Sequence, residues 1–213
     1  MTILQEQLDR ITAHTRELVQ AERLEFIERA IVELHASGAE DRILPAGARA
    51  PEFSLPDASN RPVRSADLLA LGPLVINFFR GRWCAYCVTE LEAWRELYEA
   101  VRARGGLVVG ISPQTAHHNE LTALQHGIPF PLLADAGCRT AEQYGLVYAI
   151  PAGQRRYYRS ILVNIPYMNG DAGWRLPLPG TYAIAPDGRV LFARAYADFR
   201  VRPEPEEVLA ALG

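Results

Sequence analysis

The chain is organised around the stretch Leu74-Val75-Ile76-Asn77-Phe78-Phe79-Arg80-Gly81-Arg82-Trp83-Cys84-Ala85-Tyr86-Cys87-Val88-Thr89-Glu90-Leu91. It begins with an apolar run typical of a buried strand and ends in a segment with helical periodicity. Gly81 lies between the two, where a glycine can adopt the positive φ that a sharp turn requires. The stretch therefore predicts a strand, a tight loop and a helix in succession.

Two cysteines, Cys84 and Cys87, lie where the predicted helix begins. Apolar residues follow them at steps of three and four, which places on one helical face Leu91, Trp94, Tyr98 and Val101. In the first turn of a helix, unpaired backbone N–H groups and the helix dipole favour an anion, and a thiolate is an anion. The Cys-x-x-Cys pair therefore predicts nucleophilic sulfur chemistry.

The composition is that of an ordinary globular protein. The chain has 213 residues, of which 49% are hydrophobic and 22% charged, and this fits about one domain with a sizeable core. A net charge of -3 gives no electrostatic basis for binding nucleic acid or an anionic membrane. All 22 basic residues are arginine, so a Schiff-base lysine and the lysine of a phosphate-binding loop are both excluded.

The first residues of the chain do not resemble a secretory signal. Residues 1–7 lack a basic segment followed by an apolar core, and no window approaches the roughly 20 apolar residues that a membrane span needs. A cytoplasmic location is therefore expected. In a reducing compartment, a lone Cys-x-x-Cys pair is typical of a redox or metal site rather than of a structural disulfide.

Zinc is the metal that such a pair favours, but a structural zinc site needs four ligands. Beyond the pair, the chain offers only Cys138 and five scattered histidines. We therefore expect no metal and no other cofactor. Cys138 itself is expected to be a small buried side chain, with a distant resolving thiol as the alternative.

The N-terminal segment has a different pattern. Residues 1–37 contain no glycine or proline before Ser37-Gly38 and carry two apolar stripes with helical spacing. The stripes slip in phase near residues 20–23, which predicts two helices or one bent helix. We therefore divide the chain into an N-terminal helical extension, residues 1–44, and a domain formed by residues 45–213. The extension either packs on the domain or mediates a homodimer.

The remaining chain predicts alternating strands and helices. In order, these are an extended segment at 52–55, a helix capped by Ser65, a strand at 107–111, a helix at 115–126, an extended piece at 131–134, a short helix ending near Tyr144, a helix over 154–165, hairpin strands at 181–185 and 189–195, and a helix beginning near Pro205. This order predicts an α/β fold with strands of mixed direction.

Residues 83–87 resemble the Trp-Cys-x-x-Cys of thioredoxins, and residues 78–90 are similar, without a gap, to the active-site loop of bacterioferritin-comigratory-type peroxiredoxins. The resemblance is closer to the peroxiredoxin-like branch of the alkyl hydroperoxide reductase and thiol-specific antioxidant family that carries a Cys-x-x-Cys. Supporting stretches lie at 50–56, 110–115, 130–135 and 177–188. The resemblance implies a thioredoxin fold, with a central mixed sheet flanked by helices, and a thiol-dependent peroxidase.

The sequence also departs from the peroxiredoxin motif. In ungapped register, the motif places its proline at Arg80, its threonine at Cys84 and its peroxidatic cysteine at Cys87, and only the last is kept. The arginine that typical peroxiredoxins carry before a strand of the hairpin falls near Pro179. A proline there resembles the one that thioredoxins keep beside their cysteines.

Several other residues acquire candidate roles from their position. Arg80 and Arg82 could supply the positive charge of the missing family arginine, or could be solvated loop residues. Glu90 occupies the position where, by the resemblance, a glutamate orders the active-site hydrogen bonds; a surface carboxylate at a helix N-terminus is the alternative. Thr181, after the proline, would border the cysteines.

The two registers assign the sulfur chemistry differently. The peroxiredoxin register favours Cys87 as the attacking thiol, whereas the thioredoxin register, with Trp83 preceding the pair, favours Cys84. We expect Cys87 to meet peroxide and Cys84 to exchange with a protein partner. Attack on a hydroperoxide would give a sulfenic acid, then a disulfide, which a thioredoxin- or glutaredoxin-like dithiol would reduce. The alternatives are a thioredoxin-like protein disulfide oxidoreductase and a redox-inert scaffold or binding module.

Overall fold

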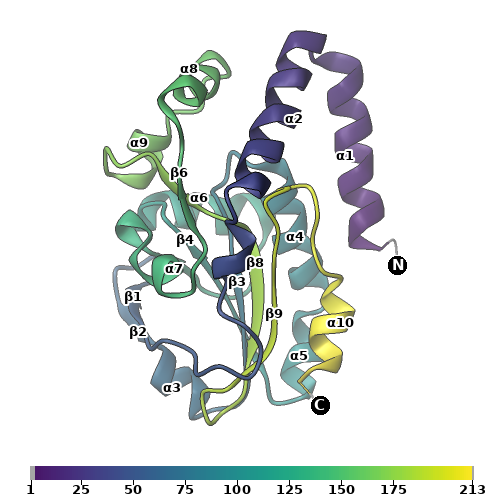
Figure 1. The fold of residues 1–213 in the computed structure, drawn as a ribbon. Coiled ribbons are helices and arrows are strands. Elements are labelled where there is room, and N and C mark those ends of the chain that lie inside the picture. Colours follow the sequence, from purple (N-terminus) through teal and green to yellow (C-terminus); the bar gives the residue numbers. More distant parts are fainter. Residues whose placement is uncertain (1–2, 213) are drawn as a thin grey trace.

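In a computed structural model, which describes residues 3–212, a five-stranded sheet forms the centre of the molecule (Figure 1). Its strand order is β5-β4-β3-β8-β9, formed by Leu132–Ala134, Leu107–Ser112, Leu74–Phe78, Gly180–Ile184 and Val190–Ala195. The central strand β3 runs parallel to β4 and antiparallel to β8. The predicted α/β fold with a mixed sheet is therefore confirmed.

Helices and short strands surround this sheet. The helices are α1 (Leu4–Leu18), α2 (Ala21–Ala36), α3 (Ser65–Leu69), α4 (Ala85–Glu96), α5 (Tyr98–Ala103), α6 (Ala116–His126), α7 (Arg139–Gln143), α8 (Ala152–Ser160), α9 (Ile165–Asn169) and α10 (Pro205–Ala210). The outer strands are β1 (Ser54–Pro56), β2 (Pro62–Arg64), β6 (Val147–Ala149) and β7 (Arg175–Pro177), and 3-10 turns lie at Glu40–Arg42 and Ala136–Cys138. No helix within residues 3–212 is both long and apolar enough to cross a membrane.

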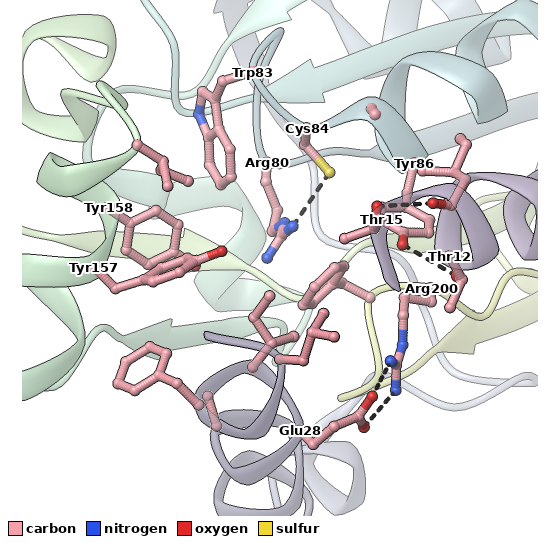
Figure 2. Close-up of a pocket in the computed structure, with 18 of the residues that line it drawn as sticks. Thr12, Thr15, Glu28, Arg80, Trp83, Cys84, Tyr86, Tyr157, Tyr158 and Arg200 are labelled. Atoms are coloured by element: carbon pink, nitrogen blue, oxygen red, sulfur yellow. Dashed lines mark hydrogen bonds and ion pairs between the residues drawn. The ribbon is translucent and has the colours of Figure 1, made fainter. Parts of the chain in front are cut away.

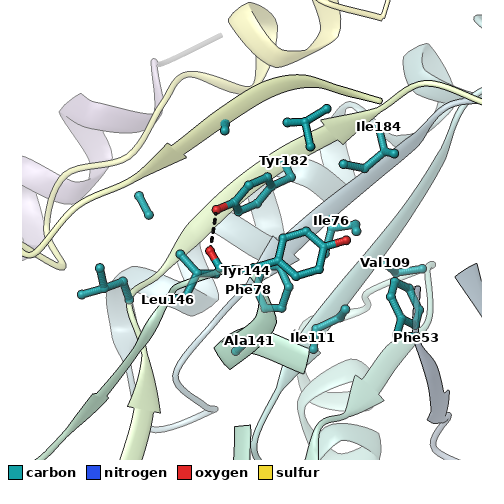
Figure 3. Close-up of a cluster of buried hydrophobic side chains, with 14 of the residues drawn as sticks. Phe53, Ile76, Phe78, Val109, Ile111, Ala141, Tyr144, Leu146, Tyr182 and Ile184 are labelled. Atoms are coloured by element: carbon teal, nitrogen blue, oxygen red, sulfur yellow. Dashed lines mark hydrogen bonds between the residues drawn. The ribbon is translucent and has the colours of Figure 1, made fainter. Parts of the chain in front are cut away.

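Strand β3 is buried along its whole length and separates two cores. Because side chains alternate along a strand, Ile76 and Phe78 enter one core, together with Tyr144 and Tyr182 (Figure 3). Val75 enters the other, which contains apolar side chains of α4, α5 and α10. Side chains of β3 on both faces of the sheet therefore fix the point at which the following loop begins.

Three local expectations differ from the structure. The helix that begins at the cysteines breaks at Leu97, which leaves helical geometry with ψ of 2°. The helix expected over 154–165 is interrupted because Leu162 takes a left-handed φ of 61°. Ser65 begins α3 but does not cap it, because its hydroxyl accepts the backbone N–H of Phe53 instead.

The N-terminal segment forms two helices, α1 and α2, as the phase slip predicted, and α1 packs against α4. Leu4 and Leu8, which belong to α1, are buried. The first turn of α1 is held from far along the chain, because the Glu204 carboxylate accepts the backbone N–H groups of Leu4 and Gln5 at 2.8 and 2.9 Å. The division at residues 44 and 45 into an extension and a domain stays a prediction.

We predict that Glu204→Ala lowers the free energy of unfolding by about 1 kcal/mol, because two N–H groups of α1 lose a capping carboxylate. Urea denaturation measures the loss, and hydrogen exchange should show faster exchange of the α1 amides. Glu206→Ala is the matched control, since Glu206 is exposed in the first turn of the same helix α10. Equal stabilities of the two variants would contradict the prediction.

Candidate active site

The loop between β3 and α4 places the first cysteine at the start of a helix. Gly81 has φ of 147°, and a Cβ there would lie 2.7 Å from Trp83 Nε1, so this position needs glycine for both conformation and space. The backbone N–H of Cys84 donates to the Gly81 carbonyl at 3.1 Å. The tight turn expected at Gly81 is present, and it delivers Cys84 to the N-cap position of α4.

Two donors converge on the sulfur of Cys84. The backbone N–H of Cys87 lies 3.4 Å from it and Arg80 Nη2 lies 3.3 Å from it. Burial raises the pKa of the Cys84 thiol, but a hydrogen bond from Cys87 and the charges of Arg80 and Arg202 outweigh burial and hold that pKa well below its usual range. Cys84 is therefore suited to be a thiolate at neutral pH.

Cys87 has the opposite character. It is fully buried, and burial, its hydrogen bond to Cys84 and the negative charge on Cys84 raise its pKa well above the usual range. Arg202 Nη2 lies 3.7 Å from its sulfur and offsets this only in part. Of the pair, Cys84 is therefore the more acidic thiol and Cys87 the less acidic one.

Arg80 is held in place by aromatic rings. Its side chain is buried, with its guanidinium carbon 4.0 Å from the centre of the Phe199 ring and 4.9 Å from that of Trp83. Among residues 3–212, Arg80 forms no ion pair with a carboxylate, whereas Arg202 is paired with Glu90. Although burial disfavours the cation, the negative charge of Cys84 keeps the pKa of Arg80 above its ordinary value. Arg80 is thus a charged partner of the Cys84 sulfur, and Tyr148 is a second hydrogen-bond partner of its guanidinium.

A polar network lies behind the second cysteine. Arg202 Nε donates to the Glu90 carboxylate at 2.6 Å, and both side chains are only 1% exposed. Thr181 Oγ1 donates to the other Glu90 oxygen at 2.9 Å, and Asn77 donates to Thr181 at 3.2 Å. Burial raises the pKa of Glu90, while Arg202 and Thr181 act in the opposite direction. The network joins α4 to strands β3 and β8 and to the segment before α10.

The structure thus gathers most of the expected residues. Glu90 and Thr181 are buried behind the cysteines, so the alternative of a surface carboxylate at Glu90 is wrong. Arg82 points away from the cysteines, because its guanidinium donates to Gln125 at an exposed site. This agrees with the alternative that Arg82 is a solvated loop residue. Pro179 is buried in the link between β7 and β8, and its role beside the cysteines stays a prediction.

A cavity of about 280 Å³ opens beside Cys84 (Figure 2). Cys84 and Arg80 line it, whereas Cys87 does not. The other walls come from α1, α2 and α8, and Tyr158 of α8 packs edge-to-face on Trp83 with 5.5 Å between the ring centres. The cavity therefore gives a small molecule access to the sulfur of Cys84.

Sequence reasoning missed two important members of the site. Arg202 and Phe199 lie more than 100 positions from the cysteines, in a segment whose local pattern predicts only the approach to a final helix. Only the closure of the sheet brings this segment over α4. Their sole sequence signal is an arginine-rich run, residues 200–202, in a chain without lysine.

Comparison with known proteins identifies the family. A family model described as the AhpC/TSA family matches residues 46–193. The chain belongs to the AhpC/TSA family. Over 100 residues, or 47% of this chain, it is 31% identical to the chloroplastic peroxiredoxin Q of Sedum lineare and 29% identical to that of Arabidopsis thaliana. These matches span 53% and 46% of the relatives, so the chain covers about half the length of each.

Solved structures show the same fold for this AhpC/TSA chain. The peroxidoxin BcpB of Mycobacterium tuberculosis superposes with a TM-score of 0.63 at 24% identity, over 79% of this chain and 96% of that one. A peroxiredoxin Q of Xanthomonas campestris gives a TM-score of 0.57 at 19% identity, over 75% of this chain and 89% of that one. The predicted peroxiredoxin-type thioredoxin fold is therefore confirmed.

We predict that Arg80→Met raises the pKa of the Cys84 thiol, because the cation that stabilises the thiolate is lost while the bulk of the side chain is kept. In a Cys87→Ser background, alkylation of Cys84 by iodoacetamide at neutral pH should slow about tenfold or more. Its pH profile should move to higher pH.

Arg82→Met is the control for this experiment, since Arg82 lies on the same loop but contacts Gln125. It should leave the alkylation profile in place. A profile that is unchanged in Arg80→Met, or shifted equally in both variants, would contradict a specific role for Arg80.

Proposed function

We propose that this protein is a thiol-dependent peroxidase in which the Cys84 thiolate attacks a hydroperoxide. The observation that carries the proposal is the buried sulfur of Cys84 in contact with Arg80 at the wall of a cavity. A thiolate is the nucleophilic form of cysteine, whose free thiol, with a pKa of about 8.5, is mostly protonated at neutral pH. The relatives compared above are named as peroxiredoxins or peroxidoxins, which supports the same reaction.

In the first step the sulfur of Cys84 attacks one oxygen of the peroxide, and the O–O bond breaks. The other oxygen leaves with a proton from solvent as water or an alcohol, and Cys84 becomes a sulfenic acid, oxidised by two electrons. In the second step the sulfur of Cys87 attacks the Cys84 sulfur and water leaves. The product is a Cys84–Cys87 disulfide.

An external dithiol would complete the cycle. A thioredoxin- or glutaredoxin-like protein would transfer two electrons and two protons to the disulfide through a mixed disulfide, and both thiols would return.

We propose the cytoplasm as the compartment, although the curated relatives compared above are chloroplastic proteins. Homodimer formation through α1 and α2 is a further proposal, for which the exposed side chains of Leu18 and Val32 are candidates.

A second candidate function is protein disulfide reduction. It is supported by the low pKa of Cys84 at the helix N-cap, because the same thiolate could attack a protein disulfide. The burial of Cys84, which is 3% exposed, favours a small substrate that reaches the sulfur through the cavity. Comparing hydroperoxide consumption with insulin reduction at equal protein concentration distinguishes the two activities.

We predict that Cys84 carries the sulfenic acid. After one equivalent of hydrogen peroxide, mass spectrometry of Cys87→Ser should show oxidation at Cys84, because this thiolate contacts Arg80 and the cavity. Cys84→Ser should react at about the rate of an ordinary protonated cysteine, on the order of a hundredfold more slowly. Cys138→Ser, which changes a buried thiol of raised pKa, is the control and should match the parent.

Sulfenic acid on Cys87 in the Cys84→Ser variant, formed at the parent rate, would reverse the assignment. It would instead support the expectation from the peroxiredoxin register that Cys87 meets peroxide.

A further inference from the structure

Oxidation of the cysteine pair would remove the negative charge at Cys84 while Arg80 stays beside it. In the reduced protein the Cys84 sulfur accepts Arg80 Nη2 at 3.3 Å and the backbone N–H of Cys87 at 3.4 Å. A hydrogen bond to a charged group is about twice as strong as one between neutral groups, and an uncharged sulfur is a weak acceptor. Both donors would therefore lose most of their stabilisation when the disulfide forms.

Arg80 has no other anion to balance its charge among the described residues, since no carboxylate of residues 3–212 forms an ion pair with it. Its remaining neighbours are uncharged: the rings of Trp83 and Phe199 lie against the guanidinium, and Tyr148 is hydrogen-bonded to it. The residue is only 4% exposed, so water cannot take over the role of the thiolate. A buried cation without a counter-charge is destabilising, and the oxidised pair would create one at Arg80.

The second arginine near the pair differs in this respect. Arg202 Nη2 lies 3.7 Å from the Cys87 sulfur, but its Nε donates to the Glu90 carboxylate at 2.6 Å. Both side chains of this ion pair are 1% exposed, and neither charge depends on the state of the cysteines. The stabilisation that is lost on oxidation is therefore concentrated at Arg80.

We infer that the Cys84–Cys87 disulfide is more oxidising than the disulfide of thioredoxin, because Arg80 stabilises the reduced pair alone. The inference rests on the disulfide of the proposed function, but not on peroxide as the oxidant that forms it. A reduction potential measures the free-energy difference between the oxidised and the reduced pair, so a contact made only in the reduced pair raises the potential.

The acidity of Cys84 supports the same direction. Its pKa is held well below the usual range, so reduction at neutral pH yields the stabilised thiolate. The reactive thiol of thioredoxin has a pKa of about 7, and its thiolate is stabilised less. Electrons should therefore flow from reduced thioredoxin to this disulfide.

The exchange proceeds in two steps. A thiolate of the partner attacks the Cys84 sulfur, the bond to Cys87 breaks, and the Cys87 sulfur leaves and takes a proton from solvent. The second thiol of the partner loses its proton to solvent and attacks the partner sulfur of this mixed disulfide, and Cys84 leaves as the thiolate that Arg80 stabilises. The partner loses two electrons and becomes a disulfide, and the cysteine pair gains both electrons. A thiol of low pKa leaves faster, so Arg80 also favours the second step.

Equilibration with thioredoxin tests the inference. The full chain is oxidised with diamide, freed of the reagent and mixed with one equivalent of reduced thioredoxin. After acid quenching and alkylation, mass spectrometry measures the oxidised and reduced forms of both proteins. The equilibrium constant for electron transfer from thioredoxin to the parent should be about 10 or more, which corresponds to about 30 mV. A constant of about 1 or less would overturn the inference.

Arg80→Met shows whether the guanidinium is responsible. It should lower the equilibrium constant about tenfold or more, a loss of about 30 mV, because the reduced pair loses its cation. Arg82→Met is the matched control and should leave the constant unchanged, since Arg82 contacts Gln125 at an exposed site. A constant that is unchanged in Arg80→Met, or lowered equally in both variants, would contradict the role of Arg80. If Arg80→Met does not fold, as judged by circular dichroism, Arg80→Gln removes the same charge and should give the same loss.

The outcomes separate this inference from the proposed function. If diamide forms no Cys84–Cys87 disulfide in the parent, both the inference and the proposed disulfide cycle are wrong. If the disulfide forms but is no more oxidising than that of thioredoxin, the inference alone is wrong and the peroxidase function stands. If the disulfide is oxidising, but the reduced protein consumes hydrogen peroxide no faster than free cysteine does, the peroxidase function is wrong and the inference stands.

Discussion

The contact between a buried guanidinium and a buried sulfur, Arg80 with Cys84, is the interaction on which the rest of the site depends. Either charge alone would be costly at this depth, because removing an ion from water costs several kcal/mol even after relaxation. Together they satisfy each other, and the faces of Phe199 and Trp83 enclose the cation without neutralising it. A carboxylate in place of those rings would compete with the thiolate for Arg80.

The contrast between the pKa values of the two buried cysteines follows first from the hydrogen bond between them, which favours a thiolate at Cys84, and then from the partners of the two arginines. Arg202 contacts Cys87 but also binds Glu90, so its charge is already balanced. Arg80 has no such carboxylate among the described residues, so its charge acts on Cys84. Because Glu90 lies one turn after Cys87 on α4, the helix itself places the balancing charge behind one sulfur and away from the other. This arrangement is the basis on which we propose Cys84 as the attacking thiol and Cys87 as the resolving thiol.

Much of this arrangement could be predicted from local sequence. The strand, glycine loop and helix N-cap are continuous in the chain, and Arg80 precedes Cys84 by only four positions, so short-range rules place them correctly. Arg202 and Phe199 could not be found in this way, because sheet closure brings them to the cysteines from over 100 residues away. The preference for Cys87 at peroxide came from motif register, which carries no information about which sulfur contacts an unbalanced cation.

One short segment links the sulfur chemistry to the access route. Phe199 packs on Arg80 and Arg202 contacts Cys87, so two residues of this segment face the reactive pair. Between and after them, Arg200 binds Glu28 of α2, and Glu204 caps α1. The same few residues therefore position both the charges around the cysteines and the helices that wall the cavity. Residues 199–204 therefore contact the reactive pair and its arginine on one side and the α1–α2 hairpin on the other.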